Sequence, residues 1–111
     1  MDTDNAMLNA QYVTVMNHGG FIMSFAVSRA DGAQAGATEY YPVQQTRSVD
    51  LATLRFGAEQ QPLEPGDEVC PVVSVVAGVS KTGPAMRYAA NSQQAVYVVT
   101  GTPLTCDIRR Y

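Results

Sequence analysis

Apolar and polar residues alternate along several short segments of the chain, with the two-residue period of a β-strand. The clearest case is 21–28. Its large apolar side chains share one face, which we expect to lie in the core: Phe21, Met23, Phe25 and Val27. The preceding segment 12–17 is rich in β-forming residues, and His18-Gly19-Gly20 between the two predicts a turn. Residues 12–28 are therefore predicted to form a β-hairpin.

The other predicted strands are short, and turns marked by glycine or proline separate them. They cover residues 38–41, 47–51, 68–77, 85–90, 94–100 and 104–109. Residues 68–77 are apolar on both faces, which is typical of a central strand covered on both sides, whereas Pro71 favours a bulge or an edge position. Both interpretations stay open. Residues 29–37, 52–68 and 80–84 are predicted loops and turns, with room for one helical turn at 51–56.

About seven short strands at regular spacing, without a long amphipathic helix, predict an all-β fold. We expect an antiparallel β-sandwich with an immunoglobulin-like arrangement. A length of 111 residues is that of one domain. Residues 1–10 have no clear period and are predicted to be a flexible N-terminal arm, so that 11–111 form the single sandwich domain.

Composition and charge narrow the classes of partner. The chain is 46% hydrophobic and 15% charged, and its net charge is −3 with the basic residues scattered, so a nucleic-acid surface is not expected. The longest apolar-rich stretch, 69–79, is too short and too interrupted to span a membrane. The polar, acidic start is unlike a signal peptide. We expect a cytoplasmic protein, with leaderless or processed export as the alternative.

Two cysteines and one histidine are the candidates for nucleophilic chemistry. Cys70 and Cys106 lie too far apart for a Cys-x-x-Cys pair, and they could be buried free thiols or a structural disulfide. Cys106 is in phase with Leu104 and Ile108 on a face expected to point inward, where a thiol is inert. His18 precedes two glycines, which is typical of a solvated turn residue. A cysteine–histidine dyad is the weaker alternative.

No cofactor or metal is predicted. Glu64, Asp67 and Glu68 cluster around Pro65-Gly66, but three side chains are few for a calcium site, and exposed acidic residues in a turn explain them. The glycine-rich motifs that bind nucleotide phosphates are absent from the sequence.

Four tyrosines are the candidate binding residues: Tyr40, Tyr41, Tyr88 and Tyr97. Tyrosine is enriched at protein interfaces and at sugar sites, although in strands it also packs half-buried. We therefore predict a non-enzymatic module that recognises a protein or glycan partner, or a second copy of itself, through loops and edge strands. The alternatives are a structural or accessory subunit of an assembly and a small cysteine-dependent enzyme.

The segment from Val13 to Val27, followed by Arg47-Ser48-Val49-Asp50-Leu51 and Gly66-Asp67-Glu68-Val69, resembles small β-sandwich proteins of the actinoporin-like, membrane-interacting kind. The resemblance implies a sandwich core and surface binding. The chain lacks the amphipathic N-terminal helix and the clustered aromatic lipid patch of those cytolysins, so the resemblance implies no pore formation and no functional residue.

Overall fold

The structure, a computed structural model, describes residues 8–76 and 78–110. Strands make up 53% of it and helix 3%, which confirms the predicted all-β fold class. The first sheet contains β1 (Asn9–Ala10), β3 (Met23–Arg29), β4 (Gln34–Ala35), β6 (Glu68–Val75), β7 (Ser80–Thr82) and β8 (Met86–Tyr88). The second contains β2 (Tyr12–Asn17), β5 (Thr46–Asp50), β9 (Gln94–Thr102) and β10 (Thr105–Arg110). A 3₁₀ turn at Leu51–Thr53 follows β5.

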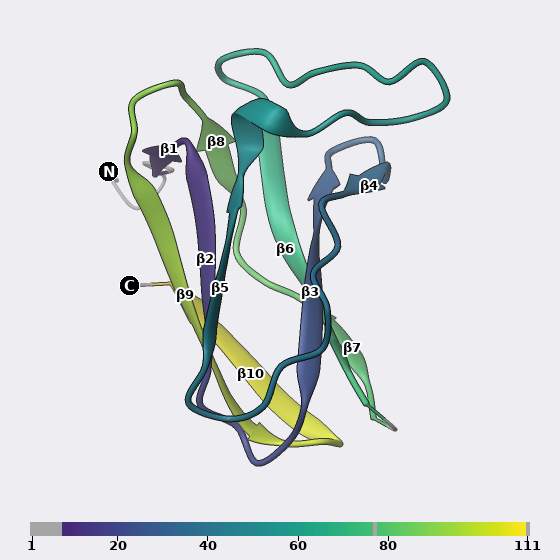
Figure 1. Cartoon of the computed structure of the whole chain (residues 1–111), viewed down its shortest axis with the longest axis vertical. Coiled ribbons are helices and arrows are strands. Elements are labelled where there is room, and N and C mark those ends of the chain that lie inside the picture. Colours follow the sequence, from purple (N-terminus) through teal and green to yellow (C-terminus); the bar gives the residue numbers. More distant parts are fainter. Residues whose placement is uncertain (1–7, 77, 111) are drawn as a thin grey trace, which may run out of the picture.

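The two sheets pack face to face as the layers of a sandwich (Figure 1). The strand order is β1-β8-β6-β3-β4, with β7 beside β6, in the first sheet and β10-β9-β2-β5 in the second. The expectation of a purely antiparallel arrangement is wrong for two pairs, because β1 runs parallel to β8 and β2 parallel to β9. The chain between β2 and β9 passes through the other sheet, and so long a connection permits parallel neighbours.

The predicted hairpin of residues 12–28 is also wrong, because β2 and β3 lie in different sheets. The buried Asn17 ends β2, and its side chain organises the turn. Its amide nitrogen donates to the carbonyl oxygen of Phe21 at 2.9 Å, and its amide oxygen accepts from the backbone nitrogen of Gly19 at 3.0 Å. These bonds close the turn on itself, and beyond it the chain enters the other sheet as β3.

The core lies between the inner faces of the two sheets. The face predicted from the alternation of 21–28 is confirmed, since its four apolar side chains are at most 9% exposed. Val49 and Leu51 are buried as well, as the alternation of 47–51 predicts. Val13 and Val15, on the inner face of the second sheet, have no exposed area. Apolar side chains at every second position thus hold the two layers together.

The structure decides between the two interpretations of residues 68–77, a central strand covered on both faces or a bulge or edge position at Pro71. β6 is an internal strand, but its side chains alternate between buried and half-buried, so it is not covered on both faces. Pro71 pairs with Val27 of β3 on one side. On the other side it lies between the segments that pair with β8 and with β7, where its carbonyl accepts from Gly83. A residue without an N–H fits there because this gap requires no donor.

Other boundaries differ from the sequence prediction. Residues 80–82, predicted as a turn, form β7, and β4 lies inside the predicted loop 29–37. Residues 38–41 form no strand, only a bridge between Tyr41 and Met23. Asn9 and Ala10 pair with β8 and so belong to the sandwich and not to an arm, whereas 1–7 lie outside the described residues. Within the described ranges, no helix is long and apolar enough to cross a membrane.

Candidate functional site

Three of the four candidate tyrosines are part of the core. Tyr41 and Tyr97 have no exposed area and Tyr88 is 7% exposed, whereas Tyr40 is 55% exposed. The hydroxyl of Tyr41 donates to the carbonyl of Val15 at 2.9 Å, and that of Tyr97 donates to Pro84 at 2.8 Å. Their polar atoms therefore serve the fold. Among these four residues, only Tyr40 offers its ring to a partner.

The two buried phenols predict a loss of stability at alkaline pH. Burial raises the pKa of both Tyr41 and Tyr97 above the ordinary value of 10. In the unfolded chain both ionise near pH 10, whereas in the folded chain they keep their protons to higher pH. The free energy of unfolding should therefore fall as the pH rises, by about 1 kcal/mol per tyrosine between pH 10 and 11.

Urea denaturation at pH 9, 10 and 11 measures this loss. The double variant Tyr41→Phe/Tyr97→Phe starts from a lower stability, since two hydrogen bonds are removed, but it should lose less stability over the same range. A wild-type free energy of unfolding that stays constant up to pH 11 would show that neither phenol resists ionisation.

The structure separates Cys70 from His18 and buries Cys106. Cys70 and Cys106 are both free thiols in the structure, and no disulfide joins them. Cys106 is 4% exposed. Cys70 pairs with Ser28 at one end of β3, whereas His18 lies in the turn before the other end of β3. A seven-residue strand is ~20 Å long, so Cys70 is out of reach of His18.

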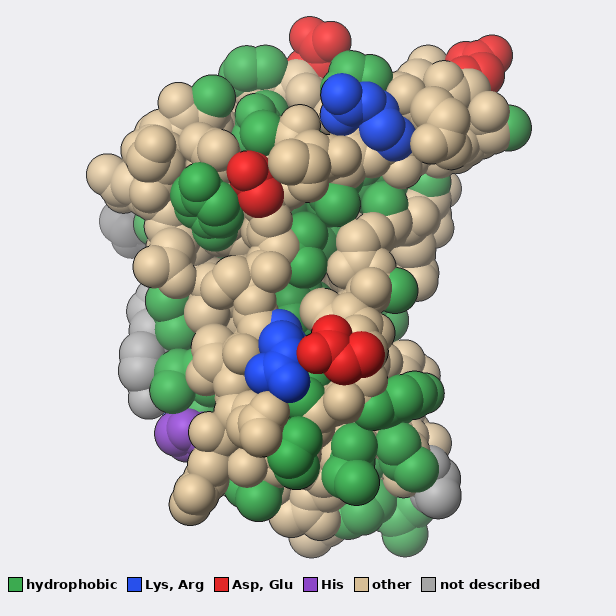
Figure 2. Space-filling model, in the orientation of Figure 1, with side chains coloured by type: hydrophobic (Ala, Val, Ile, Leu, Met, Phe, Trp, Pro, Cys, Tyr) green, Lys and Arg blue, Asp and Glu red, His purple; other side chains and the backbone are tan. Residues whose placement is uncertain are grey.

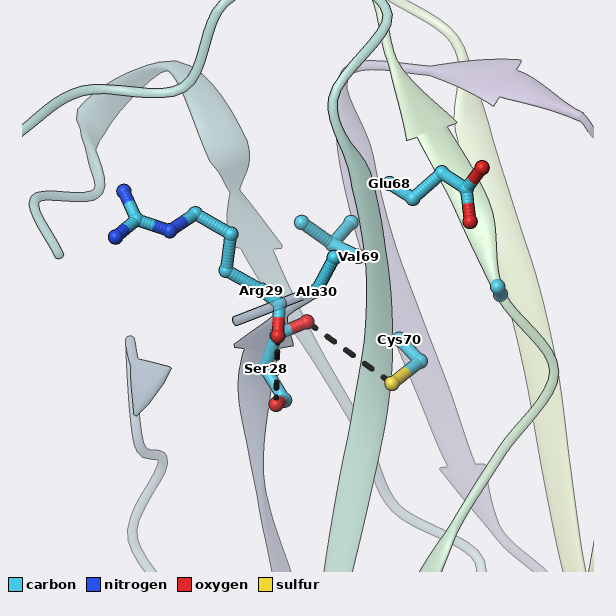
Figure 3. A pocket seen from close by; sticks show the side chains of 7 residues that line it. Ser28, Arg29, Ala30, Glu68, Val69 and Cys70 are labelled. Carbon is cyan, nitrogen blue, oxygen red and sulfur yellow. Dashed lines mark hydrogen bonds between the residues drawn. The ribbon is translucent and has the colours of Figure 1, made fainter. Parts of the chain in front are cut away.

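A pocket of about 190 Å³ lies beside the half-buried Cys70 (Figure 3). Its thiol points towards the carbonyl oxygen of Ser28, at 3.9 Å, and the guanidinium of Arg29 extends away from the sulfur. Burial raises the pKa of the Cys70 thiol. A thiol without a nearby cation and with a raised pKa stays protonated at neutral pH, and so it is a poor nucleophile.

Arg29 instead fastens the long loop 54–67 to the edge of the first sheet. It pairs with Asp31, stacks on the ring of Phe56 at 5.3 Å, and donates to Gln61 at 3.3 Å. The hydrogen bond from Arg29 lowers the pKa of Asp31 to about 2. The acidic residues Asp67 and Glu68 lie near Arg29, but within the described ranges no three His, Cys, Asp or Glu side chains converge as metal ligands would.

The exposed large hydrophobic side chains of the described residues lie on loops at one end of the sandwich (Figure 1). We call it the apolar end. It consists of the exposed large hydrophobic side chains: Ile22 47%, Tyr40 55%, Val43 45%, Val76 46% and Leu104 73%. Figure 2 shows hydrophobic side chains gathered at the lower end of the molecule, where Figure 1 places the β2–β3 turn and the β9–β10 hairpin. Exposed apolar clusters of this kind mark interaction sites.

Backbone hydrogen bonds hold these loops together. The nitrogen of Val76 donates to the carbonyl of Ile22 at 3.0 Å, and the nitrogen of Gly20 donates to Gly101 at 3.1 Å. The nitrogen of Val79 donates to Pro103, next to Leu104, at 3.1 Å. Loops from both sheets are thus tied to one another at the apolar end.

The loop 36–45, which carries Tyr40 and Val43, is joined to β3 by the bridge between Tyr41 and Met23. Both of these side chains point into the core, so their neighbours Ile22 and Tyr40 point out of it. Leu104, expected to face inward with Cys106 and Ile108, points outward because it lies in the turn between β9 and β10 and not in a strand.

Sequence reasoning missed most of the apolar end. Ile22 was visible as a bulky residue on the otherwise small or polar face of 21–28, and Pro103-Leu104 as an apolar residue in a turn. Neither signal shows that the two residues meet, since their loops are far apart in the chain. Of the predicted binding residues, only Tyr40 belongs to this surface.

No protein-family model matches the sequence, and neither does any curated protein. Solved structures are similar in fold. The chain matches a structure described as a Gram-negative toxin with a TM-score of 0.51 and 7% identity, over 93% of this chain and 23% of the toxin. Pneumolysin matches at 0.47 and 8% identity, and intermedilysin, solved with human CD59, at 0.47 and 12%, each over 90% of this chain and 23% of theirs.

The chain thus spans about a quarter of the length of these toxins. At such low identity the likeness concerns the fold alone. It supports an all-β fold and does not point to actinoporin-like proteins in particular, nor does it confirm the immunoglobulin-like arrangement. The described residues therefore form an all-β sandwich that is similar in fold to one domain-sized part of a Gram-negative toxin.

Proposed function

We propose that the protein is a non-enzymatic interaction module that binds a protein partner through its apolar end. The observation that carries this proposal is the exposure of five large hydrophobic side chains on loops that are tied together by backbone hydrogen bonds. Leaving such side chains in water costs free energy that a partner surface would recover. Loops on a rigid sandwich scaffold are a common place for recognition.

The chemistry of the apolar end favours a protein over a glycan or an anionic membrane. Four of its five side chains are aliphatic, and they offer no hydrogen bond to sugar hydroxyls. None of the five is charged. Arg47 lies over the ring of Tyr41 and pairs with Glu39 at 2.7 Å. Lys81, in β7, donates to the carbonyl of Cys106 at 3.0 Å, so both cations are already engaged and less available to lipid phosphates. An uncharged apolar surface fits the hydrophobic centre of a protein interface.

Site-specific photocrosslinking tests the proposal in cells that produce the protein. A photoreactive amino acid at Leu104 is expected to give one discrete protein adduct, and the same probe at the exposed Glu59, in the loop at the opposite end, is expected to give none. The double variant Ile22→Asp/Val76→Asp should reduce the Leu104 adduct at least tenfold, because two charges must then lose water in an apolar interface.

Two results would overturn the proposal. One is an equal pattern of adducts, or no adduct, from the probes at Leu104 and Glu59. The other is flotation of the purified protein with phosphatidylcholine vesicles that is lost in the Ile22→Asp/Val76→Asp variant, since this would assign the apolar end to a lipid surface.

A further inference from the structure

A second, chemically different site lies on the outer face of the second sheet. It is a small open groove of about 280 Å³ across the neighbouring strands β5, β2 and β9. The outer-face groove is lined by four residues, with Thr14 next to them: Tyr12, Ser48, Ser92 and Gln94. Val13 and Val49 point into the core, so Tyr12, Thr14 and Ser48 point outward.

A chain of hydrogen bonds fixes the polar groups of the groove. Thr14, only 6% exposed, donates its hydroxyl proton to the amide oxygen of Gln94 at 2.7 Å. Its hydroxyl is also 2.8 Å from that of Ser48. Since Thr14 has one proton to give, Ser48 is the donor of this second bond. The amide oxygen of Gln94 is thereby held towards Thr14, which leaves the two amide protons of Gln94 for a ligand.

The rim of the groove is held in place as well. Ser92 has a left-handed backbone conformation, with φ of 62°, although it is not glycine. Its backbone nitrogen donates to the side-chain oxygen of Gln11 at 3.0 Å, and the side-chain nitrogen of Gln11 donates to Asp50 at 3.2 Å. Backbone strain that neighbouring contacts maintain is often found at binding sites.

We infer that this groove binds a neutral saccharide. Its lining combines one half-buried tyrosine ring with hydroxyl and amide groups and contains no charged side chain. A sugar ring presents C–H groups that pack on an aromatic face and hydroxyls that both donate and accept hydrogen bonds. Phosphates and sulfates would find no cation here, and an apolar ligand would leave the amide of Gln94 unpaired. A groove of this size suits a terminal sugar better than a long polymer.

The saccharide site is independent of the proposed protein docking. Tyr12 and Gln94 lie where β2 and β9 begin, whereas the apolar end lies beyond Asn17, where β2 ends. Six strand residues place the two sites ~17 Å or more apart. A failure at one site therefore leaves the other untouched.

The test begins with an array of neutral and anionic glycans, followed by NMR titration of ¹⁵N-labelled protein with the best neutral sugar. We expect binding to neutral terminal sugars and shifts of the Tyr12, Ser92 and Gln94 amide signals, without shifts at Ile22 or Leu104. Gln94→Ala and Tyr12→Ala are each expected to weaken binding about tenfold, through the loss of hydrogen bonds or of the ring. Gln93→Ala, at the adjacent exposed glutamine, should bind as the wild type does.

Gln94→Glu keeps the size of the side chain and removes its amide protons, so it should also lose binding, and it keeps the inference testable if Tyr12→Ala does not fold. The inference is wrong if no neutral glycan binds at millimolar concentration, if only anionic glycans bind, or if Gln94→Ala and Gln94→Glu bind as tightly as the wild type.

Discussion

The Asn17→Ala variant is expected to lose about 3 kcal/mol of the free energy of unfolding. Asn17 is completely buried and makes three hydrogen bonds to backbone groups, at 2.9 Å to Phe21, 3.2 Å to Tyr41 and 3.0 Å from Gly19. The carbonyl of Tyr41 keeps its bond from Met23 when the side chain is removed. The carbonyl of Phe21 and the nitrogen of Gly19 lose their partner, and an unpaired buried polar group costs about 1–3 kcal/mol.

Urea denaturation measures this loss, and Asn9→Ala is the matched control because Asn9 is exposed. The control should lie within about 0.5 kcal/mol of the wild type. If Asn17→Ala loses less than about 1 kcal/mol, the turn does not depend on its amide. The same variant should weaken crosslinking from Leu104, since Asn17 organises the turn that carries Ile22.

The Gly101→Ala variant is expected to be destabilised by about 3 kcal/mol, through backbone strain and a steric clash. Gly101 has φ of 108°, and a Cβ at this position would lie 2.5 Å from the carbonyl oxygen of Thr105 and 3.1 Å from the Cα of Cys106. Both contacts are with the backbone of the paired strand β10, which cannot move without breaking the hairpin that carries Leu104.

Gly32→Ala separates the two contributions. Gly32 has a similar φ of 93°, but a Cβ there would meet nothing within 4 Å. It should therefore cost only the conformational strain, about 1–2 kcal/mol. Thermal denaturation of both variants gives the comparison. Equal losses would show that the β9–β10 hairpin relaxes around the new methyl group, and the expected steric contribution at Gly101 would then be wrong.

The candidate site was largely hidden from sequence analysis. Leu104 lies in phase with Cys106 and Ile108 and was predicted to be buried, but it falls in a turn where the alternation of strand faces no longer applies. The sequence leaves Tyr41 and Tyr97 open to binding or to packing, and the structure shows that each is buried and donates to a backbone carbonyl. The periodic pattern cannot tell a buried tyrosine with a partner from an exposed one.

The residues of the outer-face groove could not be brought together from the sequence either. Thr14, Ser48 and Gln94 are unremarkable polar residues far apart in the chain, and they meet because β2 lies between β5 and β9. This placement depends on the parallel pairing of β2 with β9, for which the sequence contains no local signal. A turn residue predicts a hairpin, but nothing comparable marks two distant parallel strands.

The amino-acid sequence by itself determined the all-β class, most of the strand positions, and the core face of Phe21, Met23, Phe25 and Val27, because burial of every second side chain is a local property of a strand. Only the tertiary structure decided which strands are neighbours, that β2 and β3 belong to different sheets, and which side chains meet at the apolar end and in the outer-face groove. These features depend on contacts between residues far apart in the chain. The buried amide of Asn17 holds the turn at which the chain passes from one sheet to the other, where the local pattern of residues favours a hairpin.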